Sequence, residues 1–356
     1  MKDGRIPKKL SVFRGNQQGA VALIIVLMLP VFLGFAALAV DVGYMMAVKA
    51  QLNNAAEAGA LSGARALVPY TGTPPQPNWA NGTLQARQTV ERNYADKQSL
   101  SVSEASPGAA VPSLAAVPPL SQATPCYYRL SDNITRPTSI TPQATDVPAM
   151  QVTVAKTAGH NGGPLPMMFA NILGYATVNL GGQAVAMVSF PRGMPVGALF
   201  PLAAAETYVT QYLPRNPPVS FKIGSGAGSY GQWTSFKVNN NSASYVAGLI
   251  SSGNPSSLNL NDNIDIQPGV KASNYGEAAS HVGQTVVIPL VNPSDINSAG
   301  PTPVLGFVAF HIEAVSQGGK YIQGHYDKDF NITNAAGVGG SAPGTLSTPN
   351  PPRLVN

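Results

Sequence analysis

One uninterrupted apolar run, from Ala20 to Val40, constrains this chain more than any other feature. The run holds 21 residues without a charged side chain, and a helix of that length crosses a hydrocarbon core of about 30 Å. Pro30 lies near its middle, where membrane helices tolerate the loss of one backbone hydrogen bond. The sequence therefore predicts a membrane span over residues 20–40.

The charges around this run predict its orientation. Residues 1–19 hold five basic residues and one acidic residue, a net +4 of the +5 that the whole chain carries. Because basic segments remain on the cytoplasmic side, we expect this tail to lie inside and everything from Asp41 onward to lie outside. Only about +1 is left for the exported part, so the charge gives no reason to expect nucleic acid as a partner.

A cleaved signal peptide is the main alternative to an anchor. Such peptides also begin basic and then apolar, and Ala37-Leu38-Ala39 resembles an A-x-A cleavage site. Against cleavage, the apolar run exceeds the usual length of about 7–15 residues, and the helical pattern continues beyond Ala39 without a break. We therefore expect the segment to be retained.

The helix is expected to continue outside the membrane, over residues 41–67. No proline occurs between Asp41 and Pro69, and apolar or small residues recur every three or four positions: Met45, Val48, Leu52, Ala55 and Gly59. A neighbouring ridge consists only of small residues, which allow close approach of another backbone: Ala56, Ala60, Ala64 and Gly63. Two partners for this face remain open, the chain's own sheet or a second helix in an assembly.

The order of these features resembles the N-terminal signature of the TadG-like pilus-assembly proteins of the Flp (tight adherence) pilus system. That signature combines a basic tail, Gly-Ala, an apolar run with a central proline, A-x-D-x-G, and an alanine-rich helix. The matching residues are Gly19, Ala20, Pro30, Asp41, Gly43, Leu52, Asn54, Ala55, Ala56, Ala60 and Leu61. Asn53 and Glu57 replace the commoner Gln and Asp. The resemblance covers about 50 of the 356 residues.

The resemblance implies a single-pass protein of the inner (cytoplasmic) membrane, with its bulk periplasmic or extracellular. Its expected partners are other pilus-assembly proteins or pilin-like subunits, with a homo-oligomer through the small-residue helix as a further candidate. Related pilins are cut after a glycine, with Glu as the fifth mature residue. Neither Gly15 nor Gly19 has Glu at that distance, so we expect the tail to remain attached.

Residues 68–190 are expected to form an α+β module, which the resemblance makes pilin-like. The pattern predicts a helix over 83–98, a strand start over 100–102, a loop over 106–125 and a strand over 150–156. A short apolar helix over 165–173 and a strand over 176–190, with a bulge at Gly181-Gly182, should follow.

Residues 191–218 hold six prolines, and we place a domain boundary there. Short strand candidates separated by Gly, Pro and Asn predict a β-rich, sandwich- or barrel-like domain over 219–330. The strand candidates are 219–223, 231–238, 258–266, 285–290, 304–315 and 321–326, with one helix over 244–251. From Asn331 the Gly/Ser/Pro-rich tail, 331–356, is expected to be flexible and poorly ordered.

The weak candidates for a metal site are two alternating pairs, His311 with Glu313 and His325 with Asp327. Alternating residues share a strand face, so the four side chains meet if the two strands are adjacent in the correct register. The alternative is a pair of solvent-facing strands, and we expect no metal. Likewise, the asparagines over 258–266 favour an Asn-rich strand face rather than a calcium loop.

No other motif indicates an enzyme. The chain has no G-x-S-x-G elbow or phosphate loop, and its one cysteine, Cys126, indicates a buried small residue rather than a redox centre. We expect no cofactor and no catalysis. The sequence predicts a membrane-anchored structural or assembly protein; the alternative is a membrane-tethered carbohydrate- or cell-wall-binding module or hydrolase.

Overall fold

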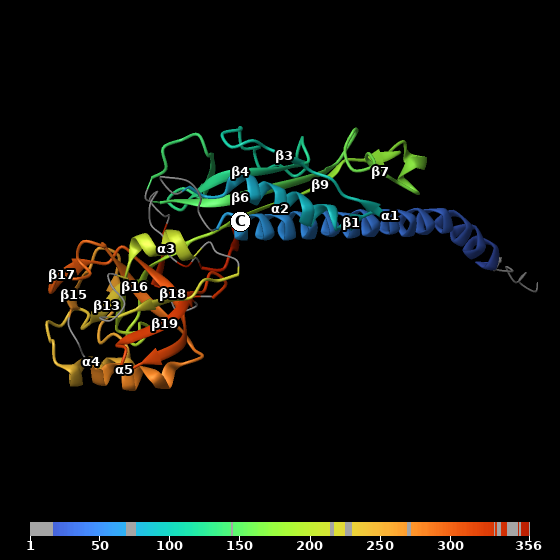
Figure 1. The fold of residues 1–356 in the computed structure, drawn as a ribbon. Helices are drawn as coiled ribbons and strands as arrows, with labels where there is room; N and C mark the ends of the chain where they lie inside the picture. Colours follow the sequence, from blue (N-terminus) through green and yellow to red (C-terminus); the bar gives the residue numbers. More distant parts are fainter. Residues whose placement is uncertain are drawn as a thin grey trace, which may run out of the picture.

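A long helix leads into a strand-rich region, which confirms the predicted mixed α+β class (Figure 1). The computed structural model describes residues 17–68, 76–143, 145–213, 217–224, 230–268, 272–330, 332, 336–339, 348 and 350–355. The predicted basic tail falls mostly on residues 1–16, outside this set, and so remains a prediction.

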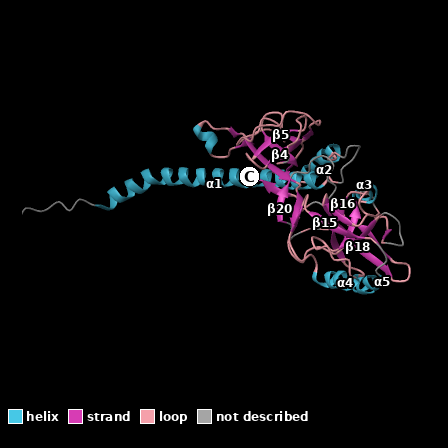
Figure 2. Cartoon of the chain, turned by 90° about the vertical axis from the view of Figure 1, so that its left-hand side faces the viewer, coloured by secondary structure: helices cyan, strands magenta, loops and turns pink. Residues whose placement is uncertain are grey.

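Helix α1, Gln17–Arg65, is 49 residues long and runs through Pro30 without a break. It is close to the predicted span over residues 20–40 together with its expected continuation over residues 41–67. Its N-terminal half projects freely, whereas its C-terminal half lies along a sheet (Figures 1 and 2). One continuous element therefore serves as a free apolar rod and as a packed core helix.

The first sheet has the strand order β21-β9-β6-β4-β3, with β5 pairing β4. Neighbours are antiparallel except β3 and β4. Helix α1 and helix α2, Trp79–Glu91, cover one face. The strands are β3 (Ser103–Glu104), β4 (Gln122–Arg129), β5 (Ile134–Pro137), β6 (Asp146–Lys156), β9 (Leu180–Met187) and β21 (Arg353–Val355).

Three local expectations for this region were wrong. The helix expected over 83–98 ends at Glu91, because Asp96 and Lys97 have positive φ angles and form the turn of the hairpin β1 (Tyr94–Ala95) and β2 (Gln98–Ser99). The helix expected over 165–173 is a 3₁₀ helix, η1 (Ala170–Leu173), between β7 (Leu165–Pro166) and β8 (Thr177–Val178). The loop expected over 106–125 ends earlier, where β4 begins.

The predicted bulge at Gly181-Gly182 is also absent, since β9 pairs with β6 in unbroken register from Leu180 to Met187. A Cβ atom at Gly182 would lie 2.3 Å from the backbone carbonyl of Leu52. The glycine therefore serves a different purpose, which is to let the backbone of α1 approach the sheet.

The second part of the strand-rich region contains an eight-stranded sheet, β12-β19-β18-β16-β11-β13-β15-β17. Its end strands do not pair with each other, so it forms a half-barrel rather than a closed barrel. Apolar cores lie on both of its faces. Its elements are β11 (Leu202–Ala205), α3 (Glu206–Tyr212), β12 (Phe221–Ile223), β13 (Gly231–Thr234), α4 (Ala243–Ser252), β15 (Asn263–Gln267), α5 (Ala272–Ala278), η2 (Ala279–His281), β16 (Thr285–Val291), β17 (Gly300–Pro303), β18 (Gly306–Ser316) and β19 (Tyr321–Tyr326).

A small sheet, β14-β10-β20, lies beside these two and includes part of the predicted boundary segment. Its strands are β10 (Phe190–Met194), β14 (Leu258–Asn259) and β20 (Ala336–Gly339). The strand expected over 258–266 is divided into β14 and β15 by a turn, in which Asn261 has φ +68°. The domain boundary over 191–218 remains a prediction, although this segment contains β11 and α3.

The expectation of a poorly ordered tail was wrong for two segments. Strand β20 pairs with β10, and β21 pairs antiparallel with β9, placing Leu354 opposite Ala186. The edge of β9 would otherwise present unpaired backbone groups, and the tail satisfies them. Composition alone does not reveal a strand whose partner lies about 170 residues away.

Candidate functional site

The free half of α1 is the most distinctive surface of the molecule. Among the described residues, α1 is the one helix long and apolar enough to cross a membrane. From Val21 to Val40 every residue is exposed except Ala37, which is half-buried. An exposed apolar surface of this extent is typical of a single-pass membrane anchor, and Pro30 and Val40 both lie on it.

Asp41 ends this surface and is almost completely buried, with 1% of its area exposed. Its carboxylate accepts three backbone hydrogen bonds, from the N–H groups of Met168 (3.0 Å), Phe169 (2.9 Å) and Ala170 (2.6 Å). Desolvation acts to raise the pKa of Asp41, but these three hydrogen bonds outweigh it and lower the pKa below its usual value. Asp41 therefore fixes the β7–β8 hairpin to α1 at the point where the apolar run ends.

The small residues of α1 pack within the chain rather than against another molecule. A Cβ atom at Gly63 would lie 2.8 Å from Ala86 Cβ and from Gly82 O of α2, and 2.8 Å from Met150 on β6. At Gly59 it would lie 2.6 Å from Val90 of α2. The other members of this face are buried in the same core: Leu52, Ala55, Ala56, Ala60 and Ala64.

Of the two expected partners, the chain's own sheet is the one in contact with this face, and the helix that packs beside it is α2 of the same chain. The first sheet and α2 occupy the side of α1 that carries Gly59 and Gly63, and the candidate homo-oligomer through this helix remains a prediction. Two residues of the family signature, Gly43 and Asn54, lie on the exposed side of the helix.

A buried ion pair belongs to a second group of polar contacts that holds α1 in place. Lys156 Nζ lies 3.2 Å from Asp96 Oδ2, and the side chain of Lys156 is almost fully buried. The Tyr44 hydroxyl donates to the carboxylate of the same Asp96, whose backbone N–H donates to Gln51 (3.0 Å). The β1–β2 turn therefore connects two turns of α1 to β6.

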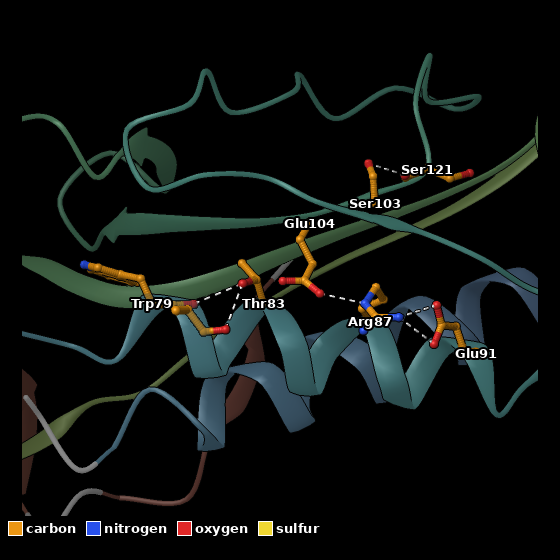
Figure 3. A network of polar contacts seen from close by, with 8 residues as sticks. Trp79, Thr83, Arg87, Glu91, Ser103, Glu104 and Ser121 are labelled. Atoms are coloured by element: carbon orange, nitrogen blue, oxygen red, sulfur yellow. Dashed lines mark hydrogen bonds and ion pairs between the residues drawn. The ribbon is translucent and has the colours of Figure 1, made fainter.

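Arg87 connects α2 to the edge of the sheet (Figure 3). Its Nε lies 2.6 Å from Glu104 on β3, and its Nη1 lies 2.8 Å from Glu91. The Ser103 hydroxyl donates to the carbonyl of Ser121, which fastens β3 next to β4 (3.1 Å). These partly exposed groups hold α2 to β3 and β3 to the start of β4.

The predicted metal candidates are brought together only in part. His311 and His325 lie opposite each other on β18 and β19, with ring centroids 5.2 Å apart. A β-bulge between Ile312 and Ala314 leaves Glu313 as an extra residue, and His325 Nδ1 lies 2.6 Å from its carboxylate. Asp327 is not part of this cluster; its carboxylate accepts from the N–H of Asp329.

The partners of these side chains do not suit metal binding or nucleophilic catalysis. Within the described residues, no group of three or more His, Cys, Asp or Glu side chains could hold a metal ion. Ser220 donates to Glu313 (2.8 Å), so the carboxylate lies between the hydroxyl and His325. A serine relay needs the histidine in that middle position. Desolvation raises the pKa of Glu313, but the hydrogen bonds from Ser220 and His325 lower it overall.

Cys126 is fully buried on the face of the first sheet that lies away from α1, beside Val147 and Met187. Burial raises the pKa of its thiol to about 12. A thiol protonated at neutral pH is a poor nucleophile and a poor metal ligand, which agrees with a packing role.

The comparison with protein families places one match on α1. Residues 19–66 match the Tad family model, described as putative Flp pilus-assembly TadE/G-like. Neither a curated protein nor a solved structure matches the chain. The matched segment contains the free apolar half of the helix, Asp41, and the small residues that pack on α2.

Proposed function

We propose that this chain is a membrane-anchored structural or assembly protein of a Flp/Tad-type pilus or a related secretion system. It acts through protein contacts of its exported part, and it is not an enzyme. The observation that supports this proposal is the position of the family match, which covers the apolar span and the core helix of the first sheet together.

The packing of α1 makes the anchor inseparable from the exported fold. Residues from Val48 to Leu67 supply one side of the core beneath the first sheet, and the apolar residues before Asp41 continue the same helix. A force or displacement applied to the exported part is therefore transmitted to the span through a rigid helix rather than through a flexible tether.

The proposed orientation has the N-terminus in the cytoplasm and both strand-rich parts outside the inner membrane. The support for it is the net charge of +4 in residues 1–19. The alternative function, a tethered cell-wall-binding module or hydrolase, would need a site with pre-positioned groups. The arrangement of Ser220, Glu313 and His325 offers no relay for such chemistry.

Photo-crosslinking in intact membranes tests the proposed contacts. A photoreactive amino acid at Asn54, on the exposed side of α1, is expected to capture pilin-like subunits or other pilus-assembly proteins. The matched control is an aliphatic diazirine amino acid at Leu52, a large buried side chain whose space it fills, and it should react only within its own chain. Capture of cell-wall glycan alone from Asn54 would contradict the assembly role and favour the alternative.

A further inference from the structure

The hairpin that Asp41 holds against α1 exposes an apolar surface of its own. Ile172 is 84% exposed, Tyr175 71% and Leu173 70%, and Met168 and Phe169 are exposed as well. The hairpin, β7–η1–β8, lies beside the middle of α1, at the end of the first sheet nearest the free half of the helix (Figure 1). We call residues 167–176 the apolar loop.

The position of this loop along α1 corresponds to the end of the span. Asp41 binds three of its backbone N–H groups, and Ala37, one turn earlier, is the one residue of 21–40 that is not exposed. The loop therefore lies beside the last turn of the apolar run. Any bilayer that surrounds the run up to Val40 reaches the loop as well.

The chain around the loop has no charge that would oppose contact with lipid. Between Lys156 and Arg192 the sequence contains no Asp, Glu, Lys or Arg. Tyr175 carries the amphipathic ring that is enriched at membrane interfaces. By contrast, a loop that lies only in water normally carries few large exposed apolar side chains, because contact between apolar surface and water is unfavourable.

Most backbone N–H groups of the loop have acceptors within the protein. Polar backbone groups in lipid must find partners within the protein. The loop N–H groups that have acceptors in the structure are those of Met167, Met168, Phe169, Ala170, Ile172, Gly174 and Tyr175. Three of these N–H groups donate to the two carboxylate oxygens of Asp41, so the buried carboxylate satisfies these donors of the loop.

From these observations we infer that the apolar loop is a second membrane contact, which inserts into the interface of the bilayer that α1 spans. It rests on the membrane anchoring proposed above. Two points of contact, a helix and a loop fixed beside it, define the rotation and tilt of the exported part relative to the membrane, whereas a single helix leaves the rotation free.

Lipid quenching in vesicles tests this inference with the full-length protein. Single cysteines are introduced into a Cys126→Ala background at three exposed apolar positions, by Ile172→Cys in the loop, Ile25→Cys in the span and Val282→Cys in the half-barrel. Each variant is labelled with an environment-sensitive fluorophore and reconstituted into phosphatidylcholine vesicles, with and without nitroxide-labelled acyl chains.

The labels at positions 172 and 25 are expected to be quenched by the nitroxide lipid and shielded from aqueous iodide, and the label at 282 to show the reverse. If position 25 is quenched and position 172 behaves like 282, the loop inference is wrong and the anchor stands. If neither is quenched, the anchor is wrong too. Shielding of position 172 that increases with protein density and is insensitive to nitroxide lipid would identify a second copy as the occupant and overturn the inference.

Discussion

Gly63 of α1 lies so close to Ala86 of α2 that a Cβ atom on the glycine would be 2.8 Å from the Cβ of the alanine. The same atom would meet the carbonyl oxygen of Gly82 at 2.8 Å. Because a backbone oxygen cannot rotate away as a flexible side chain does, this contact defines how closely the two helices approach.

The substitution Gly63→Ala is expected to destabilise the protein, although alanine favours a helix by about 1 kcal/mol over glycine. Overpacking in a filled core costs about 1–3 kcal/mol, which exceeds that gain. The matched control is Gly43→Ala, on the same helix, where no atom lies within 4 Å of the added Cβ. Denaturant unfolding of the detergent-solubilised chain should show a lower midpoint for the first variant and an unchanged or higher midpoint for the second. Equal midpoints for the two variants would show that the helices do not pack as described.

Asp41→Asn is expected to loosen the apolar loop, because an amide offers one weaker acceptor where the carboxylate serves three N–H groups. Hydrogen exchange followed by mass spectrometry should be faster in residues 166–177 of the variant at pH 7. Strand β16 serves as the internal control and should exchange equally in both proteins. Unchanged exchange over residues 166–177 would mean that Asp41 does not hold the loop.

The difference in hydrogen exchange between the wild type and Asp41→Asn is also expected to depend on pH. The pKa of Asp41 is lowered in the folded state, so its stabilising effect is present above the usual carboxyl pKa of 3.8 and is lost as the pH falls through the lower, folded value. The ratio of exchange rates between variant and wild type should therefore approach one below that folded pKa. A ratio that stays constant from pH 7 downward would contradict this assignment.

The sequence was most informative where one helix dominated. Charge, length and the spacing of small residues predicted α1 and its packed face, because each depends only on residues close together in the chain. The partner of Asp41 was not predicted, since the apolar loop follows it by more than 120 residues. The charge-free stretch between Lys156 and Arg192 was the available signal for that loop.

The geometry of the candidate metal site could be predicted only in part from the sequence. Alternation placed His311 and His325 on strand candidates but left the pairing and register of those strands open, and it gave no sign of the bulge that repositions Glu313. Turns with positive φ at Asp96, Lys97 and Asn261 likewise divided segments that were predicted as single elements. Such turns depend on long-range pairing as much as on local composition.

The double variant His311→Asn, His325→Asn is expected to fold and to support assembly, apart from a small packing cost on β18 and β19. Elemental analysis of the purified full-length protein should find no stoichiometric transition metal in either wild type or variant. Stoichiometric zinc in the wild type that is lost in the variant would instead support the alternative function, a membrane-tethered hydrolase.

Retention of the anchor predicts that protease added outside the inner membrane digests the strand-rich parts and leaves a protected N-terminal fragment containing residues 20–40. N-terminal sequencing of the protein from membranes should find a start before Ala20. A mature N-terminus at Val40 would identify a cleaved signal peptide and remove both the anchor and the loop inference.

The most direct test of the assembly role is the amount of surface pili in cells that lack this chain. Pilin sheared from the cell surface should fall sharply in a deletion strain, return with the full chain and return with the His311→Asn, His325→Asn variant. It should not return with a chain whose residues 1–40 are replaced by a cleavable signal peptide, since that protein lacks the span. Normal pili in the deletion strain would contradict the account.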